Sequence, residues 1–132
     1  MKKVLLFAAI AVALSGCVTQ QDVDRAMASQ RPPSAAIKAN ITRDARDYLL
    51  DPYSVRDAEI SSVMDATPDG KLQFVCVKAN AKNAIGAYTG RSTISVRLVG
   101  SSPVSTNPNA VACGMPLLRW YPFKELENLK NI

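Results

Sequence analysis

The side chains of this sequence that could carry out chemistry are carboxylates, lysines and cysteines, because the 132-residue chain contains no histidine. Without histidine, a serine or cysteine nucleophile lacks its usual general base. Two carboxylate pairs have suitable spacing: Asp44 with Asp47 on a predicted helix, and Asp57 with Glu59 on one face of a predicted strand. Such a pair could hydrolyse a glycosidic bond only if it flanked a cleft. Both pairs are more typical of a solvated surface, and the sequence therefore predicts a protein that is not an enzyme and that uses no cofactor or metal.

A second group of polar side chains lies in residues 80–90, NAKNAIGAYTG, between two predicted strands. Lysine and asparagine offer charge and amide groups, glycine lets a ligand approach the backbone, and tyrosine could stack on a sugar or an aromatic ring. The same composition suits a hairpin connection, because asparagine and glycine tolerate left-handed backbone conformations. The sequence leaves both interpretations open. The candidate binding residues are Lys78, Asn80, Lys82, Asn83, Gly86, Tyr88 and Gly90.

A candidate contact cluster follows near the C-terminus, in the segment LLRWYPF. Aromatic residues and arginine are enriched in the hot spots of protein interfaces. The alternative is that the aromatic rings pack against the sheet. The cluster consists of Arg119, Trp120, Tyr121 and Phe123.

The N-terminus predicts export and lipid anchoring. Lys2 and Lys3 precede an apolar run over residues 4–14, which is shorter than the about 20 residues of a transmembrane helix and suits the core of a signal peptide. The LSGC that ends at Cys17 resembles the lipobox of bacterial lipoproteins. The resemblance implies cleavage after residue 16 and a diacylglycerol on the Cys17 sulfur, and Val18 in place of aspartate favours the outer membrane. The open alternative is an ordinary secreted protein with Cys17 as a spare thiol.

The two remaining cysteines are predicted to form a disulfide. If the lipid modifies one of the three cysteines, Cys76 and Cys113 are left as a pair, and disulfides are common outside the cytoplasm. The bond would close a loop of about 38 residues and stabilise the fold by about 4 kcal/mol. Two separate buried thiols are the alternative.

A second resemblance covers residues 51–90. DPYSVRDAEI at residues 51–60 and VCVKANAKNAIGAYTG at residues 75–90 are similar to a group of small uncharacterised bacterial envelope proteins with the signature C-x-x-x-NAKN-x-x-G-x-YTG. The sequence departs from the group at Ala87, where a second glycine is more usual. The resemblance implies a shared structural feature and no particular activity.

The pattern of the chain predicts an α+β fold, in which an N-terminal helix packs on a three- to four-stranded antiparallel sheet and a short helix ends the chain. Residues 17–33 are expected to be a flexible tether and residues 34–132 a single domain. Helices are predicted over residues 34–50 and 123–130, from apolar spacing and flanking prolines. Strands are predicted over residues 55–65, 72–80, 92–100 and 110–113, with a turn at 66–71 and a loop at 101–109.

These features favour a periplasmic binding or accessory lipoprotein that contacts another envelope protein. Without the two lysines of the predicted signal peptide, the formal net charge of +5 falls to +3, which is too small to indicate nucleic-acid binding. The alternatives are a small inhibitor of a glycan-cleaving enzyme, resembling the lipoprotein inhibitors of lysozyme in size and location, and a small hydrolase.

Overall fold

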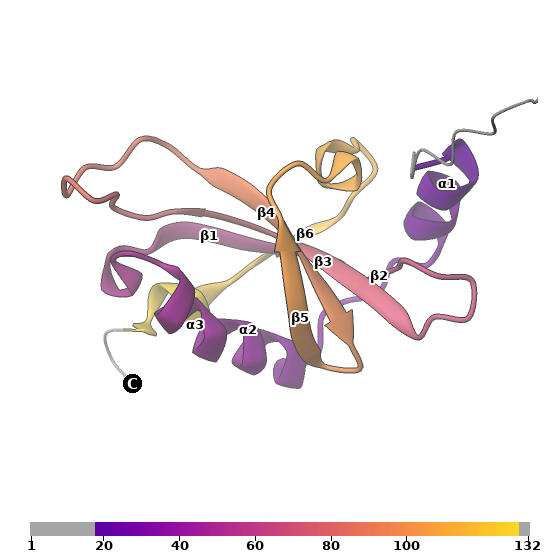
Figure 1. The fold of residues 1–132 in the computed structure, drawn as a ribbon, viewed down its shortest axis with the longest axis horizontal. Coiled ribbons are helices and arrows are strands. Elements are labelled where there is room, and N and C mark those ends of the chain that lie inside the picture. The colour runs from indigo at the N-terminus through magenta and orange to yellow at the C-terminus, as the bar shows by residue number, and fades with distance from the viewer. Residues whose placement is uncertain (1–17, 130–132) are drawn as a thin grey trace, which may run out of the picture.

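A computed structural model of the chain describes residues 18–129 (Figure 1). The predicted signal peptide and the predicted lipidation site, Cys17, lie outside these residues. The elements follow in the order α1 (Gln20–Ala28), α2 (Ala35–Tyr48), the 3-10 helix η1 (Pro52–Ser54), β1 (Arg56–Ser61), β2 (Met64–Asp65), β3 (Leu72–Asn80), β4 (Ser92–Val99), β5 (Ser102–Asn107), the 3-10 helix η2 (Val111–Gly114), β6 (Trp120–Pro122) and α3 (Lys124–Glu127).

The predicted α+β class and the antiparallel pairing are confirmed. The strand order is β5-β4-β3-β1-β6, and β2 pairs with β3 beyond the end of β1. The described residues thus form a sheet of six strands, so the predicted count of three or four is wrong. The predicted strand over residues 55–65 is interrupted after Ser61, and β5 and β6 were not predicted as strands.

Both faces of β3 are covered. Val75 and Val77 belong to a core that also contains Ile37 and Ile41 of α2. Cys76 points to the other side, into a smaller cluster that includes Ala26 of α1. The apolar character of both faces of this strand predicted such a central position, because a strand with one solvated face would alternate with polar residues.

The helix α2 begins where the sequence predicts. The Ser34 side chain accepts a hydrogen bond from the Ile37 N–H at 3.2 Å, which caps the helix. Ile37 and Ile41 are buried on the side that faces the sheet. The helix ends at Tyr48, ahead of Pro52 of η1. The C-terminal helix α3 is shorter than predicted, since it ends at Glu127.

Two predictions in the C-terminal half are wrong. The predicted loop at residues 101–109 contains β5, and the predicted strand at residues 110–113 is the 3-10 helix η2. β5 is mostly exposed and polar, and its backbone pairs with β4 without help from apolar side chains. It forms one edge of the sheet, and a register irregularity opposite Arg97 and Leu98 leaves Val104 outside the regular pairing.

Residues 18–33 of the predicted flexible tether form regular structure. Thr19 and Asp22 form a capping box that starts α1, and Val23 and Ala26 of this helix are buried. Arg31 forms an isolated β-bridge with Val63. Most of this segment is therefore packed on the domain. The capping box was present in the sequence as T-x-x-D, a weaker form of the usual signal because that signal ends in Glu or Gln.

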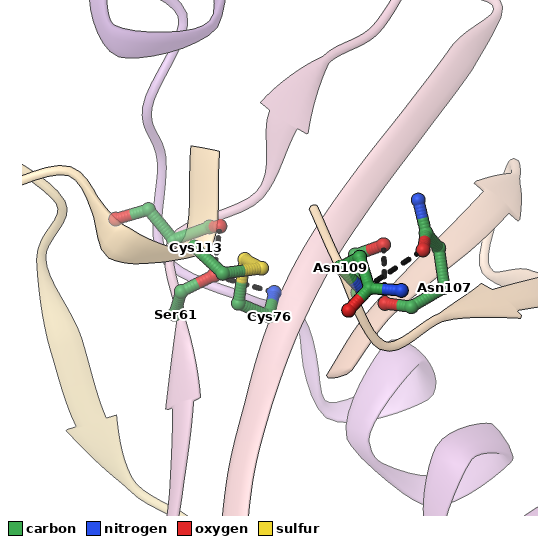
Figure 2. The surroundings of a disulfide bond; sticks show 7 residues. Ser61, Cys76, Asn107, Asn109 and Cys113 are labelled. Carbon is green, nitrogen blue, oxygen red and sulfur yellow. Dashed lines mark hydrogen bonds between the residues drawn. A yellow bond between two sulfur atoms is a disulfide. The ribbon is translucent and has the colours of Figure 1, made fainter. Parts of the chain in front are cut away.

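The predicted disulfide between Cys76 and Cys113 is present (Figure 2). It joins the middle of β3 to η2, whereas the sequence placed Cys113 on a strand. Cys76 is fully buried. Its N–H donates to the Ser61 hydroxyl at 2.7 Å (Figure 2). This hydroxyl donates in turn to the Ser62 carbonyl at 2.8 Å.

Removal of the disulfide is expected to destabilise the fold. The double variant Cys76→Ala/Cys113→Ala should lose about 4 kcal/mol of unfolding free energy, because its unfolded chain is no longer cross-linked. The measurement is urea denaturation of both proteins at neutral pH. Reducing agent should lower the stability of the native chain to that of the variant and leave the variant unchanged. Equal stability of the oxidised native chain and the variant would contradict the prediction.

The helix α3 is joined to the sheet through Glu127. One carboxylate oxygen of Glu127 accepts the Ala58 N–H at 2.9 Å, and the other lies 3.2 Å from the Lys124 ammonium. The backbone hydrogen bond from Ala58 lowers the pKa of Glu127, with a smaller contribution from Lys124, although partial burial opposes the shift. The native state therefore favours the charged carboxylate.

The variant Glu127→Gln should cost about 1 kcal/mol at neutral pH, since the backbone bond then ends on a neutral acceptor. The native pKa lies below the unfolded one. The stabilisation of the fold by the Glu127 carboxylate is therefore complete above the pKa of a free glutamate. It is lost as the pH falls through the pKa of Glu127 in the native state. Denaturation at several pH values should show the difference between native and variant shrinking in acid. The matched control is Glu125→Gln, also on α3, which removes a carboxylate paired with Lys38 of α2. This control should have a smaller effect.

Candidate functional site

The stretch of residues 80–90 connects β3 to β4 as a hairpin. The two strands stay in register up to the pairs Lys78 with Thr93 and Ala79 with Ser92. This supports the simpler interpretation of the stretch as a connection, yet the connection is long. Figure 1 shows that it extends beyond the rest of the sheet at one end of the molecule. We call residues 81–91 the β3–β4 loop.

Asn83 organises the tip of this loop. Its side-chain oxygen accepts the N–H groups of Ile85 and Ala87, both at 3.1 Å. Its backbone N–H donates to the Ala87 carbonyl at 3.0 Å, and its carbonyl accepts the Gly86 N–H at 3.0 Å. Gly86 has φ of 77°, which requires glycine although nothing crowds its position. The Asn83 side-chain oxygen therefore holds the loop together.

Tyr88 fixes the base of the loop to η1. Its hydroxyl donates to the Ser54 carbonyl at 2.6 Å, and the Lys82 N–H donates to the Ser54 hydroxyl at 2.8 Å. The Arg56 guanidinium lies 3.7 Å from the centre of the Tyr88 ring, and the Lys82 ammonium lies 5.7 Å from it. Both distances suit cation–π contacts. One face of the ring is thus already occupied by Arg56, which leaves less of it for a sugar.

Lys78 belongs to a separate group of charges, which lies on β1, on β3 and at the end of the β3–β4 loop. One Glu59 oxygen lies 2.6 Å from the Arg91 guanidinium and 3.9 Å from the Lys78 ammonium. The Lys78 ammonium also lies 4.0 Å from the centre of the Trp120 ring. Cross-strand pairing brings Glu59 opposite Lys78. The charge of Lys78 is therefore engaged within the sheet.

Three of the four carboxylates that could have formed catalytic pairs lie close to cations. Asp57 lies 3.6 Å from Arg56, and Glu59 contacts Arg91 and Lys78. The register shifts between Arg56 and Glu59, and Asp57 has φ of 54°, which is uncommon for a residue other than glycine. This bulge breaks the alternation from which a shared face was predicted. On α2, Asp44 lies 3.4 Å from Arg43 on the exposed surface.

Asn80 is the most buried polar residue of the candidate site, with 6% of its surface exposed. Its side-chain oxygen finds no hydrogen-bond partner among residues 18–129. A buried acceptor without a partner destabilises the fold by about 1–3 kcal/mol. Gly90, with φ of 104°, ends the loop before β4 and again requires glycine for its backbone conformation.

The predicted contact cluster is not a single surface. Phe123 is fully buried and joins the core under α2, and Tyr121 packs against the same core. Trp120 packs on the opposite side of the sheet, near the disulfide. Arg119 is exposed, and its N–H donates to the Gln30 side chain at 2.9 Å. The arrangement supports the alternative interpretation, in which these aromatic rings pack as core.

The structure contains an apolar hollow that the sequence did not predict. It has a volume of about 390 Å³ and lies between α2 and strands β3 to β5, with Tyr48, Ile94 and Val104 in its lining. No pattern in the sequence indicates it, because the sequence predicts a loop where the structure has β5. The neighbouring edge is poorly suited to adding a strand, since Pro103 has no N–H and Val104 sits at the register irregularity.

The β3–β4 loop combines a fixed backbone with an exposed apolar tip. Ile85 is 87% exposed, and the cations of Arg56 and Lys82 lie at the loop base. Within residues 18–129 no group of three acidic or cysteine side chains is placed to hold a metal ion. In the same part of the chain, no helix has the length and apolar character needed to span a bilayer.

Comparisons with family models, with curated proteins and with solved structures find no match to this chain. The interpretation of the loop therefore depends on its own geometry.

The variant Asn83→Ala is expected to loosen the tip of the loop. Each lost hydrogen bond contributes about 1 kcal/mol, so exchange of the Ile85 and Ala87 amide hydrogens with solvent should accelerate several-fold. Hydrogen exchange followed by NMR is the measurement. Amides of β3, such as that of Cys76, should exchange at an unchanged rate and serve as the internal control. Unchanged exchange at Ile85 and Ala87 would contradict the role given to Asn83.

Proposed function

We propose that this chain is a bacterial lipoprotein, anchored in the outer membrane through Cys17, whose periplasmic domain binds another envelope protein and catalyses no reaction. The LSGC sequence supports the anchor, and the disulfide between Cys76 and Cys113 suits an oxidising compartment. The carboxylates Asp57 and Glu59 are engaged with cations, which gives little support to the alternative of a small hydrolase.

The observation that carries the proposal is the fixed, projecting β3–β4 loop. Its backbone is held by Asn83 and its base by Tyr88 and Ser54, so little conformational entropy is lost when a partner binds it. Ile85 presents an exposed aliphatic side chain at the tip. An apolar anchor surrounded by polar groups is the usual centre of a protein contact.

The same loop favours one further candidate, an inhibitor of a glycan-cleaving enzyme. A rigid loop can enter a cleft, and the clefts of such enzymes contain a pair of carboxylates. Lys82 and Arg56 would bring cations close to those carboxylates, while Ile85 would enter the cleft first. The inhibitor and the accessory protein use the same contact surface and differ in the partner.

The test is crosslinking in intact envelopes followed by capture of the tagged chain. The native protein is compared with Ile85→Asp, which places a charge at the loop tip without touching the bonds of Asn83 or Tyr88. The matched control is Val99→Asp, an exposed aliphatic residue at the other end of β4. Loss of an interface anchor typically costs about 2 kcal/mol or more, so recovery of the partner should fall at least tenfold with Ile85→Asp and stay unchanged with the control.

Equal recovery from the native chain and from Ile85→Asp would contradict a role for the loop in binding. The inhibitor candidate is tested separately with purified lysozyme and a cell-wall substrate. Inhibition that disappears with Ile85→Asp and persists with Val99→Asp supports it. No inhibition at concentrations well above that of the enzyme removes lysozyme as the target.

A further inference from the structure

Helix α1 is fixed to the domain at its C-terminal end. Ala26 is buried beside Met64, Cys76 and Leu118. The Ser29 hydroxyl accepts the Asp65 N–H at 2.8 Å. These contacts leave α1 little freedom to swing relative to the sheet.

The residues that follow α1 add further bonds. The Gln30 side chain donates to the Leu117 carbonyl at 3.1 Å and accepts the Arg119 N–H at 2.9 Å. Arg31 and Val63 exchange backbone hydrogen bonds of 3.1 and 2.7 Å. The Arg31 guanidinium also lies 3.0 Å from the Asp65 carboxylate. The segment between α1 and α2 is thus part of the sheet assembly.

The start of α1 is equally well defined. The Thr19 hydroxyl accepts the Asp22 N–H at 3.2 Å, and the Asp22 carboxylate accepts the Thr19 N–H at 3.1 Å. Val23, in the next turn, is 9% exposed. Cys17 precedes Thr19 by two residues, and two residues of extended chain span about 7 Å. A lipid on Cys17 would therefore be held close to the domain surface.

The surface next to this point carries few charges and is partly apolar. A hollow of about 450 Å³ lies between α1 and the segment after β4, and both Val18 and Val111 line it. Each of these valines is 64% exposed. The sequence has no Lys, Arg, Asp or Glu between Arg97 and Arg119. We call residues 107–112, together with Val18, the anchor face.

Three charged side chains, Asp22, Asp65 and Arg97, also line this hollow. The Asp65 carboxylate is paired with the Arg31 guanidinium at 3.0 Å. The Asp22 carboxylate is already engaged by the capping box and by Arg25 at 2.9 Å. Arg97 suits the anionic headgroups of a lipid surface. The anchor face therefore brings few uncompensated charges to a membrane interface, where apolar side chains gain from burial.

The β3–β4 loop lies at the end of the molecule opposite to α1. Figure 1 shows α1 and this loop at the two ends of the longest axis. Nine residues of β3 run between them, and a strand of this length spans about 30 Å. The cations Arg56, Lys82 and Arg91 lie towards the loop end. The two surfaces differ in both charge and position.

We propose that the anchor face rests on the bilayer that holds the Cys17 lipid, and that the domain presents the β3–β4 loop away from the membrane. The partner of the anchor face is the lipid surface itself. The inference depends on the lipidation of Cys17 in the proposed function. It replaces the expected flexible tether by a short connection that fixes which end of the domain faces the membrane.

The test uses the full lipidated chain in vesicles of phosphatidylethanolamine and phosphatidylglycerol, part of which carry brominated acyl chains. Trp120 is the only tryptophan of the sequence, and Trp120→Phe removes its background fluorescence. In that background, the indole introduced by Val111→Trp should be quenched by brominated lipid several-fold more than the indole introduced by Ile85→Trp. Asn109→Trp, an exposed position on the anchor face, is a second probe if Val111→Trp disturbs folding. Circular dichroism checks each variant.

The two proposals fail in different ways. Equal quenching of Val111→Trp and Ile85→Trp, or stronger quenching of Ile85→Trp, in a chain whose mass includes the lipid overturns the orientation alone. A mass that shows no lipid on Cys17 overturns the anchoring, and with it the orientation. Strong quenching of Val111→Trp and weak quenching of Ile85→Trp in the lipidated chain is the result that supports the inference.

Discussion

Val75 and Cys76 are neighbours on β3 and point to opposite sides of the sheet, yet both are fully buried. Each face of this strand must therefore be covered by another part of the chain. Helices α2 and α3 cover one face, while α1 and η2 cover the other. The disulfide links η2 covalently to β3, and the apolar cluster on this face is the smaller of the two. A short domain can bury few apolar side chains, so a covalent link adds a substantial part of its stability.

The β3–β4 loop depends on this central strand and also on η1, which comes earlier in the chain. Ser54 accepts hydrogen bonds from both Lys82 and Tyr88, and Arg56 covers the Tyr88 ring. Asp57, with its unusual positive φ, is the next residue after Arg56. Residues that hold backbone strain often lie at functional sites, because the surrounding structure must stabilise them. The position of the loop is thus set by contacts that are distant in sequence.

The sequence predicted the elements that carry strong patterns. β3 was found with its correct bounds because both of its faces are apolar, and α2 because Ser34, Ile37 and Ile41 combine a cap with helical spacing. The disulfide followed from the number of cysteines. β5 was missed because Ser102–Asn107 pairs through its backbone and buries little. The bonds of Tyr88 and Gln30 could not be predicted, because their partners are far away in sequence, and the split of Trp120 and Phe123 between two faces required knowledge of β6.

Strand β5 is an edge strand of the sheet. The unpaired backbone groups of an edge strand can form hydrogen bonds with a strand of another protein molecule. Pro103 removes one hydrogen-bond donor from this edge, and the irregularity at Val104 disturbs the spacing that a second sheet would need. Both features disfavour edge-to-edge pairing. Proteins confined to a membrane plane meet far more often than the same number of molecules in a volume. If the chain is anchored by a lipid as proposed, the interrupted edge would allow many copies to crowd together without joining into continuous sheets.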